Sequence, residues 1–349
     1  MPGGLPPTFG ARVAALPSIA RVTVVSGDNV WLTGSETKAG TVVDQPTVPN
    51  LIPIDAIAVD PPTYASFLPA GNRAVVADLR KGEAILGRSS ARLRGLGIGA
   101  VMHFQTGGSV TIIGILPDDL VGAAELVVNG ATGRSIGIQH DRYLLMSPSP
   151  GTHPSAPALE GRLVQFLPTS MLYRMVRVRA PGQAAYLRAG DLVLPPVLIK
   201  RRFGEWTGRP DPVHPGYLEL DPAWVQAHIV STSIPLLGQV TCNKKLVPQL
   251  RGAMLDVQKR GLASTIHSFA GCYSARFVER QPDASISHHT WGIAVDINAD
   301  TNAFGVTPTQ DPRLVRIMRA WGFVWGGDFL VPDGMHFEYL RTPSRLSHG

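Results

Sequence analysis

The chain has 349 residues, of which 44% are hydrophobic and 17% charged, and its formal net charge is +6. This length exceeds that of a typical single domain and the hydrophobic content is ample for packed cores, which argues for at least two domains and against a disordered chain. The 37 glycines and 30 prolines indicate many turns and a largely β or irregular architecture, without the period of collagen.

Residues 1–145 are predicted to form an N-terminal α+β domain. Runs of β-branched residues around Ser-Gly-Asp-Asn predict a strand, a turn and a second strand between Ile19 and Leu32, and an apolar strand is expected over residues 51–60. From Gly82 to Leu96 apolar residues lie near one face of a predicted helix, and residues 97–116 then have the pattern of a hairpin.

Part of this region has a weak family resemblance. The run Ile85-Leu-Gly-Arg-Ser-Ser-Ala-Arg-Leu, followed by Gly97-Ile-Gly and Val110-Thr-Ile-Ile-Gly-Ile-Leu116, faintly resembles the extracytoplasmic core domain of transporter permeases of the MacB/FtsX type. The resemblance includes no catalytic motif, and a generic unit of a helix packed on a hairpin explains the pattern equally well. It implies at most an envelope domain for support or for interaction with an envelope protein partner.

Two connecting segments are expected next. Residues 146–161 are rich in Pro and Ser and predict a linker. Residues 162–228 are predicted to be β-rich, because apolar and basic residues alternate, notably in Met175-Val-Arg-Val-Arg179 and Asp191-Leu-Val-Leu-Pro195. Residues 160–209 hold nine Lys or Arg against three acidic residues. They could face an anionic polymer or a membrane surface, or they are scattered on a solvated β surface; no aromatic-interleaved basic motif suggests a nucleic-acid partner.

Residues 229–345 are predicted to form a third, α+β unit of two helices against a small sheet. Asn243 can cap the first helix, which Gly261 ends. Asp311-Pro312 starts the second helix and Gly322 closes it. The residues expected to face the core are Leu246, Leu250, Met254 and Val257 in the first helix, and Leu314, Val315, Met318 and Trp321 in the second.

Two short strands of this unit carry a candidate metal site. Between Ala294 and Asn298 the apolar residues take one face, so Asp296 points to the other, and Gly292 permits a turn that folds His289 back beside it. Met335 and Phe337 alternate with His336 and Glu338 in a second half-buried strand. His289, Asp296 and His336 could then converge, which is the ligand set of a catalytic zinc site.

A base for such a site is also present. Asp333 lies three residues before His336, beside Gly334, in the turn that leads into the strand. Its carboxylate could accept the proton of a water molecule at the site.

These motifs carry a specific resemblance. The patterns Ser287-x-His289-x-x-Gly292-x-Ala294-x-Asp296, Trp-Gly-Gly-Asp (325–328) and Asp333-x-x-His336-x-Glu338 resemble the M15 family of zinc peptidases, the group of D-alanyl-D-alanine carboxypeptidases and L-alanyl-D-glutamate endopeptidases. Gly271-Cys272-Tyr273 and Arg276 stand where that family has a Gly-x-Tyr-x-x-Arg-like segment, whose arginine binds substrate or the developing oxyanion. The resemblance covers roughly residues 232–340.

The resemblance implies a fold of the Hedgehog/DD-peptidase type and a zinc ion bound by His289, Asp296 and His336. It selects His289 over the neighbouring His288 as ligand. It implies hydrolysis of peptidoglycan stem peptides as a D-Ala-D-Ala carboxypeptidase, with Asp333 as base and Arg276 as catalytic and substrate-binding residue. Further substrate-binding residues are expected at Tyr273, Ser287 and Glu338, the last two of which could instead orient ligands. Carboxypeptidases of the family often carry Glu where this chain has Asp333, so an L-Ala-D-Glu endopeptidase is the alternative.

Cys242 and Cys272 are the only cysteines, and in a chain that acts on cell wall they are consistent with one disulfide or with two buried free thiols. An extracellular or cell-envelope location is expected, although Met1-Pro-Gly-Gly-Leu-Pro-Pro is no signal peptide and no apolar run of about 18 residues could span a bilayer. Either the sequence omits an export segment or another route is used. The rival hypotheses are a non-catalytic envelope protein that binds cell wall and a cytosolic dipeptidase.

Overall fold

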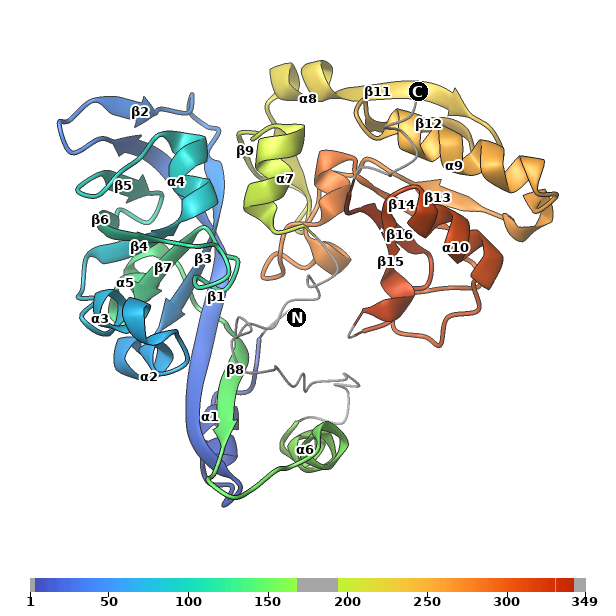
Figure 1. The fold of residues 1–349 in the computed structure, drawn as a ribbon. Helices are drawn as coiled ribbons and strands as arrows, with labels where there is room; N and C mark the ends of the chain where they lie inside the picture. The colour runs from blue at the N-terminus through green and yellow to red at the C-terminus, as the bar shows by residue number, and fades with distance from the viewer. Residues whose placement is uncertain (1–3, 168–193, 330, 342–349) are drawn as a thin grey trace.

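The computed structural model describes residues 4–167, 194–329 and 331–341. In Figure 1 an N-terminal part, blue to green, lies beside a C-terminal part, yellow to red, with helix α7 (Pro196–Phe203) between them. Both parts combine helices with strands, which confirms the α+β class. No helix of the described residues is long and apolar enough to cross a membrane.

The N-terminal part is built on a mixed eight-stranded sheet in which β1 pairs with β2, β3, β5 and β8. Because β5 pairs back onto β1, the strands β1, β3, β7, β4, β6 and β5 close into a ring. The strands are β1 (Ile19–Glu36), β2 (Val42–Asp44), β3 (Ile52–Val59), β4 (Glu83–Gly87), β5 (Val101–Phe104), β6 (Ser109–Leu116), β7 (Leu126–Asn129) and β8 (Asp141–Pro148).

Side chains alternate between the two faces of these strands and so supply two cores. In β3, Ile54 and Ala56 belong to one cluster with residues of α4 (Arg88–Arg94) and α5 (Gly130–Ile136). Ile57 belongs to a second cluster on the other face. That cluster is covered by α2 (Pro61–Ala65) and α3 (Arg73–Ala77), while α1 (Phe9–Ala14) packs at the far end of β1.

Two predicted elements of this part are wrong in detail. The turn expected inside residues 19–32 is absent, because Ser26 to Asn29 pair continuously with β3 and β1 runs through as one strand. The helix expected from Gly82 begins only at Arg88, and Glu83–Gly87 is a strand between β6 and β7. A strand that is buried on both faces has a continuous apolar run, which periodicity cannot distinguish from a helix.

The connecting segments are more helical than expected. Strand β8 extends to Pro148, and α6 (Ala156–Leu163) occupies the end of the predicted linker. The described part of residues 162–228 holds α7 and α8 (Pro222–His228) and only the short strands β9 (Gly208–Pro210) and β10 (Leu218–Leu220), so the β-rich prediction is wrong there. The strand predicted at residues 175–179, and residues 191–193 of the strand predicted at 191–195, lie outside the described residues. A proline in the first turn starts both α7 and α8.

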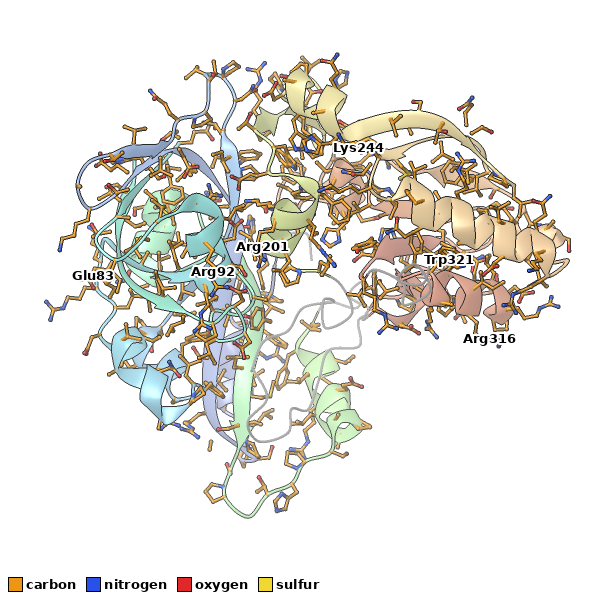
Figure 2. All side chains as sticks on the ribbon, turned by 45° about the horizontal axis from the view of Figure 1, so that its top comes forward. Glu83, Arg92, Arg201, Lys244, Arg316 and Trp321 are labelled. Carbon is orange, nitrogen blue, oxygen red and sulfur yellow. A yellow bond between two sulfur atoms is a disulfide. The ribbon has the colours of Figure 1, made fainter. Side chains whose placement is uncertain are left out.

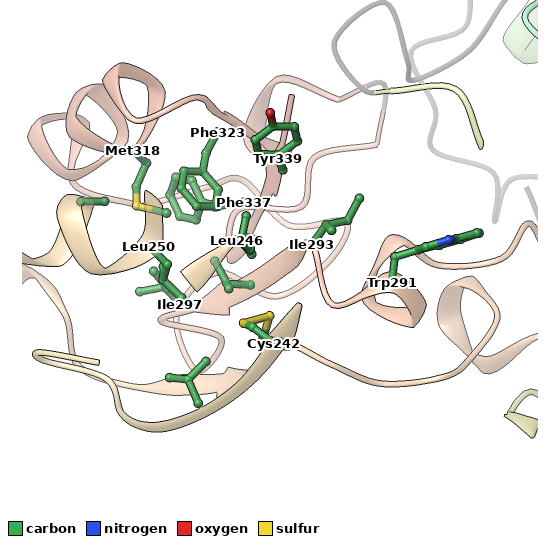
Figure 3. Close-up of a cluster of buried hydrophobic side chains, with 14 of the residues drawn as sticks. Cys242, Leu246, Leu250, Trp291, Ile293, Ile297, Met318, Phe323, Phe337 and Tyr339 are labelled. Carbon is green, nitrogen blue, oxygen red and sulfur yellow. A yellow bond between two sulfur atoms is a disulfide. The ribbon is translucent and has the colours of Figure 1, made fainter. Parts of the chain in front are cut away.

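The C-terminal part contains the predicted two helices and small antiparallel sheet, and also a β-hairpin that was not predicted from the sequence. The hairpin is β11 (Ile229–Ile234) and β12 (Gly238–Asn243), and the four-stranded sheet has the order β13-β14-β16-β15. Helices α9 and α10 pack against the sheet around the buried residues shown in Figure 3. These elements are β13 (Phe269–Gly271), β14 (Ala294–Ile297), β15 (Phe323–Trp325), β16 (His336–Tyr339), α9 (Val247–Lys259) and α10 (Pro312–Ala320).

The helix ends agree with the prediction at three of four positions. Asp311 caps α10 by accepting a hydrogen bond from the backbone N–H of Arg313, and Gly261 and Gly322 follow the two helices with positive φ. Asn243, however, does not cap α9. Its side chain accepts from the N–H of Lys245 and donates to the carbonyl of Trp291, so it holds the turn before the helix to the segment before β14.

A buried group of charges joins the two parts of the chain. Lys200 of α7 donates to Glu125 at 2.6 Å and to the carbonyl of Pro53, both in the N-terminal part. Arg94 of α4 pairs with Glu205 at 2.5 Å, just beyond α7. Helix α7 is therefore fastened to the N-terminal sheet by ion pairs that are largely buried.

The change Lys200→Met is expected to destabilise this junction by about 3–5 kcal/mol, because it leaves the buried Glu125 without its closest cation. Urea unfolding measures the effect, with the exposed Lys81→Met as matched control. Equal unfolding midpoints for the two variants would contradict the interpretation.

Candidate metal centre

The sheet register brings two of the predicted ligands together. In the antiparallel pair β14–β16, Asp296 is the direct cross-strand partner of His336. His289 comes from the 3-10 helix η6 (His288–Trp291), which ends at Gly292 with a φ of +65°. Gly292 fits closely here, since a Cβ would lie 2.7 Å from the backbone nitrogen of Asn243. The chain can therefore turn sharply from His289 into β14, as the sequence predicted.

The three side chains converge on one point. His289 Nε2 lies 3.2 Å from Asp296 Oδ2 and 3.3 Å from His336 Nδ1, and His336 Nδ1 lies 3.2 Å from Asp296 Oδ1. Zinc–nitrogen bonds of about 2.0–2.1 Å in a tetrahedron place neighbouring ligand atoms about 3.3 Å apart. The spacing of the three donors thus fits a tetrahedral ion with a fourth position left for another ligand.

Each imidazole has an inner nitrogen, which faces the other two side chains, and an outer nitrogen, which contacts an acceptor elsewhere. The contacts of the outer nitrogens leave the inner ones able to bind a metal. His289 Nδ1 lies 2.7 Å from the carbonyl of Cys272, and His336 Nε2 lies 3.0 Å from Glu338 Oε2. Both partners are acceptors, so each ring places its proton on the outer nitrogen when it is neutral. The lone pairs of both rings then point at the carboxylate of Asp296, an arrangement that a cation satisfies.

Burial and hydrogen bonds shift the pKa values of the three groups in different directions. Burial opposes ionisation of Asp296, but hydrogen bonds with His289 and His336 outweigh it and hold the pKa of Asp296 well below its usual range. Burial lowers the pKa of His289. Burial also acts to lower the pKa of His336, but hydrogen bonds with Asp296 and Glu338 raise it well above 6.5. A metal ion held by these residues would have to displace a proton from His336.

A third histidine, His288, contacts the carboxylate that orients His336. His288 Nδ1 lies 2.9 Å from Glu338 Oε2, the same oxygen that contacts His336. Burial acts to raise the pKa of Glu338, but the charge of His288 and hydrogen bonds from both histidines lower it to about 2. The sequence raised His288 only as an alternative ligand and missed this role. The position of Glu338 two residues beyond His336 on one strand was its only local signal.

Asp333 lines the same cavity as the three convergent side chains. Its Oδ1 is buried and has no hydrogen-bond partner among the described residues, while its backbone is fixed by bonds to Gly326 and His336. Burial raises the pKa of Asp333 to about 6. Arg276 lies near enough for the charges of Asp296 and Asp333 to act on it, and burial lowers the pKa of its guanidinium. A carboxyl group with a raised pKa and a guanidinium group therefore line the same cavity as the three convergent side chains.

The site opens into a cavity of about 740 Å³ between the two parts of the chain. The C-terminal part contributes the three convergent residues with Arg276, Glu279, Ser287, Asp333 and Glu338, and the N-terminal part contributes residues that include Asp28, Asn29 and Arg142. Ser287 caps η6 by accepting the N–H of His289, which supports an orienting role. Tyr273, predicted to bind substrate, is not among the residues that line this cavity.

Cys242 of β12 and Cys272 beside β13 form a disulfide, visible at Cys242 in Figure 3. The carbonyl of Cys272 is the acceptor that orients His289. The disulfide therefore connects the hairpin to the backbone that fixes one proposed ligand.

Replacing both cysteines by alanine is expected to lower the free energy of unfolding by about 3–4 kcal/mol, the chain-entropy value for a loop of this size, since the cysteines are separated by 30 positions. The zinc affinity should fall as well, because the carbonyl of residue 272 loses its anchor. Denaturant unfolding and zinc titration measure the two effects. Unchanged values in both would show that the disulfide supports neither.

Comparisons with known proteins agree with the motifs. Residues 280–339 match the M15 family model described as D-alanyl-D-alanine carboxypeptidase, which confirms the resemblance of the C-terminal part and indicates a peptidase. No curated protein matches the chain.

Among solved structures, the periplasmic region of MacB from Actinobacillus actinomycetemcomitans matches with 12% identity over 47% of this chain and 73% of that one, at a TM-score of 0.32. A domain of a putative permease from Porphyromonas gingivalis matches with 18% identity, 47% and 75% coverage and a TM-score of 0.27. Both are of the type that the N-terminal sequence resembles, but TM-scores this low establish no function.

Proposed function

We propose that the protein is a zinc-dependent peptidase that hydrolyses an amide bond in peptidoglycan stem peptides, as a D-Ala-D-Ala carboxypeptidase. The observation that carries this proposal is the convergence of His289, Asp296 and His336 at mutual distances of 3.2–3.3 Å. Asp333 lines the same cavity, and its buried Oδ1 has no hydrogen-bond partner among the described residues. The match of residues 280–339 to the carboxypeptidase family model supports it.

His289, Asp296 and His336 would hold the zinc ion. When bound, zinc polarises a carbonyl group and lowers the pKa of a water ligand to about 7. Asp333 accepts the proton of the attacking water and later donates it to the leaving amine, a role suited to a carboxyl group whose pKa is raised to about 6.

Arg276 would stabilise charge on the substrate, and His288 with Glu338 would position a metal ligand. Arg276 lines the cavity and offers a cation to the oxyanion that develops on the scissile carbonyl, or to a carboxylate of the substrate. His288 and Glu338 hold the imidazole of His336 in the tautomer that leaves Nδ1 free.

The second candidate is an L-Ala-D-Glu endopeptidase, because the base is Asp333 where family carboxypeptidases often carry Glu. For either reaction the substrate lies outside the cytosol. The disulfide favours an oxidising compartment, and we place the protein in the cell envelope or outside the cell, with the N-terminal part available to an envelope partner.

Incubation of the purified protein with stem pentapeptide and with muropeptides, with and without chelator, tests the proposal. Release of D-Ala identifies the carboxypeptidase, and cleavage after L-Ala identifies the endopeptidase. Absence of any product from zinc-loaded protein, with Asp333→Ala behaving as the parent does, leaves the non-catalytic wall-binding protein as the alternative.

A further inference from the structure

The turn that follows Arg276 is held in an unfavourable backbone conformation. It is the short helical turn η5 (Val278–Arg280), in which both Glu279 and Arg280 have a φ of +53°. Residues with a Cβ rarely adopt this left-handed backbone conformation, and two such residues in succession are tolerated only where the surroundings fix them. Such positions concentrate at functional sites.

One side of the turn is fastened by the segment before β10. Arg280 Nε donates to the hydroxyl of Tyr217 at 2.7 Å, and the N–H of Phe277 donates to the carbonyl of Gly216 at 2.9 Å. Gly216 allows this close approach, since a Cβ there would lie 2.1 Å from the carbonyl oxygen of Arg280. These contacts fix Arg280 and leave the side chain of Glu279 unused.

The N-terminal part fastens the other side. Arg142 of β8 donates to the carbonyl of Asp283 at 2.6 Å and also binds Asp28. Asn29 of β1 donates to the carbonyl of Ala284 at 3.5 Å. Both parts of the chain therefore hold the loop that carries Glu279.

The fixed turn presents a carboxylate to the catalytic cavity. Glu279 lines the cavity together with Arg276 and Asp333, and its charge acts on both of those groups. Its side chain is exposed, and none of the described residues forms a hydrogen bond or an ion pair with its carboxylate. A surface glutamate that contributed only to solubility would not require a strained backbone conformation.

We propose that Glu279 is a substrate-binding residue that forms an ion pair with a primary ammonium group of the peptide whose bond is cleaved. This deepens the proposed function and rests on it. The ammonium group has two sources in a stem peptide, the α-amine of a short substrate and the side-chain amine of a diamino acid. Either would bring one positive charge to the carboxylate of Glu279.

The test compares zinc-loaded full-length protein with its Glu279→Gln variant on a lysine-containing stem peptide in three forms: unmodified, acetylated at the α-amine and acetylated at the side-chain amine. The parent should cleave one acetylated form about fivefold less efficiently in kcat/KM than the unmodified peptide, the size expected for a partly exposed ion pair. Glu279→Gln should lose that preference while its zinc content stays unchanged. The acetylated form that loses activity identifies which amine is bound.

The matched control is Glu83→Gln, which changes a glutamate of β4 far from the cavity and is labelled in Figure 2. It should retain the parental preference. A preference that persists in Glu279→Gln, or no preference in the parent, would overturn the proposal.

Calorimetric binding of the same peptides in the Asp333→Asn background separates this inference from the proposed function. If the parent cleaves nothing, the peptidase proposal fails. Discrimination between free and acetylated peptides that depends on Glu279 would still establish an ammonium site, and binding that ignores Glu279 would exclude it.

Discussion

Replacement of Asp333 by Asn is expected to lower kcat by about 10²–10⁴-fold while the protein still binds one zinc ion, because general-base catalysis contributes an effect of this size. The substitution keeps the shape of the side chain and removes its ability to accept a proton. Its buried Oδ1 has no hydrogen-bond partner among residues 4–167, 194–329 and 331–341, so no neighbouring contact is lost with it. Steady-state kinetics and metal analysis of the same preparation measure both quantities.

The pH profile gives an independent check of Asp333. A base must be deprotonated to act, and burial raises the pKa of Asp333 to about 6, so kcat/KM should fall as the pH drops through a value near 6. A cation bound beside the carboxylate favours its ionised form, which places this limb at or below pH 6 in the zinc-loaded protein. Asp333→Asn should lose the limb. An Asn variant with parental kcat would exclude Asp333 as the base.

The change His289→Ala or His336→Ala is expected to abolish stoichiometric zinc binding and to leave activity at the background of the assay. Each change removes one of the three proposed ligands, whose donor atoms lie 3.2–3.3 Å apart. No other His, Cys, Asp or Glu of the described chain belongs to this group. Equilibrium dialysis with zinc measures the loss.

His288→Ala is the matched control for the ligand variants. His288 contacts Glu338 and not the metal position, so its removal should weaken zinc affinity or activity only about 10–100-fold. Zinc bound by His289→Ala as tightly as by the parent would contradict the assignment, and so would a complete loss of zinc in His288→Ala.

The sequence predicts the candidate site better than it predicts the fold around it. The alternation of Asp296 with apolar neighbours and of His336 with Phe337 fixes which face each side chain takes, and Gly292 marks the turn that returns His289 to them. These are local signals. The ring tautomer of His289 was not predictable, because it depends on the carbonyl of Cys272, which is supplied by a distant segment.

The N-terminal part shows the opposite case. Residues 83–87 have an apolar pattern that fits a helix as well as a strand, and only their pairing with β6 and β7 decides between them. The Ser-Gly-Asp-Asn of β1 has turn residues, but β3 holds them extended along its length. The cavity between the two parts also depends on long-range contacts such as that of Arg142 with Asp283, which no local pattern encodes.

The direct pairing of Asp296 with His336 has a consequence for folding. A slip of β16 by one residue along β14 would set Phe337 against Asp296 and turn the imidazole to the opposite face of the sheet. An ion that needs both groups is bound in one alignment only, and its binding free energy stabilises that alignment against every misregistered competitor. Zinc binding would then select the correct register of β16 on β14, so a chain that holds the ion has a correctly paired sheet.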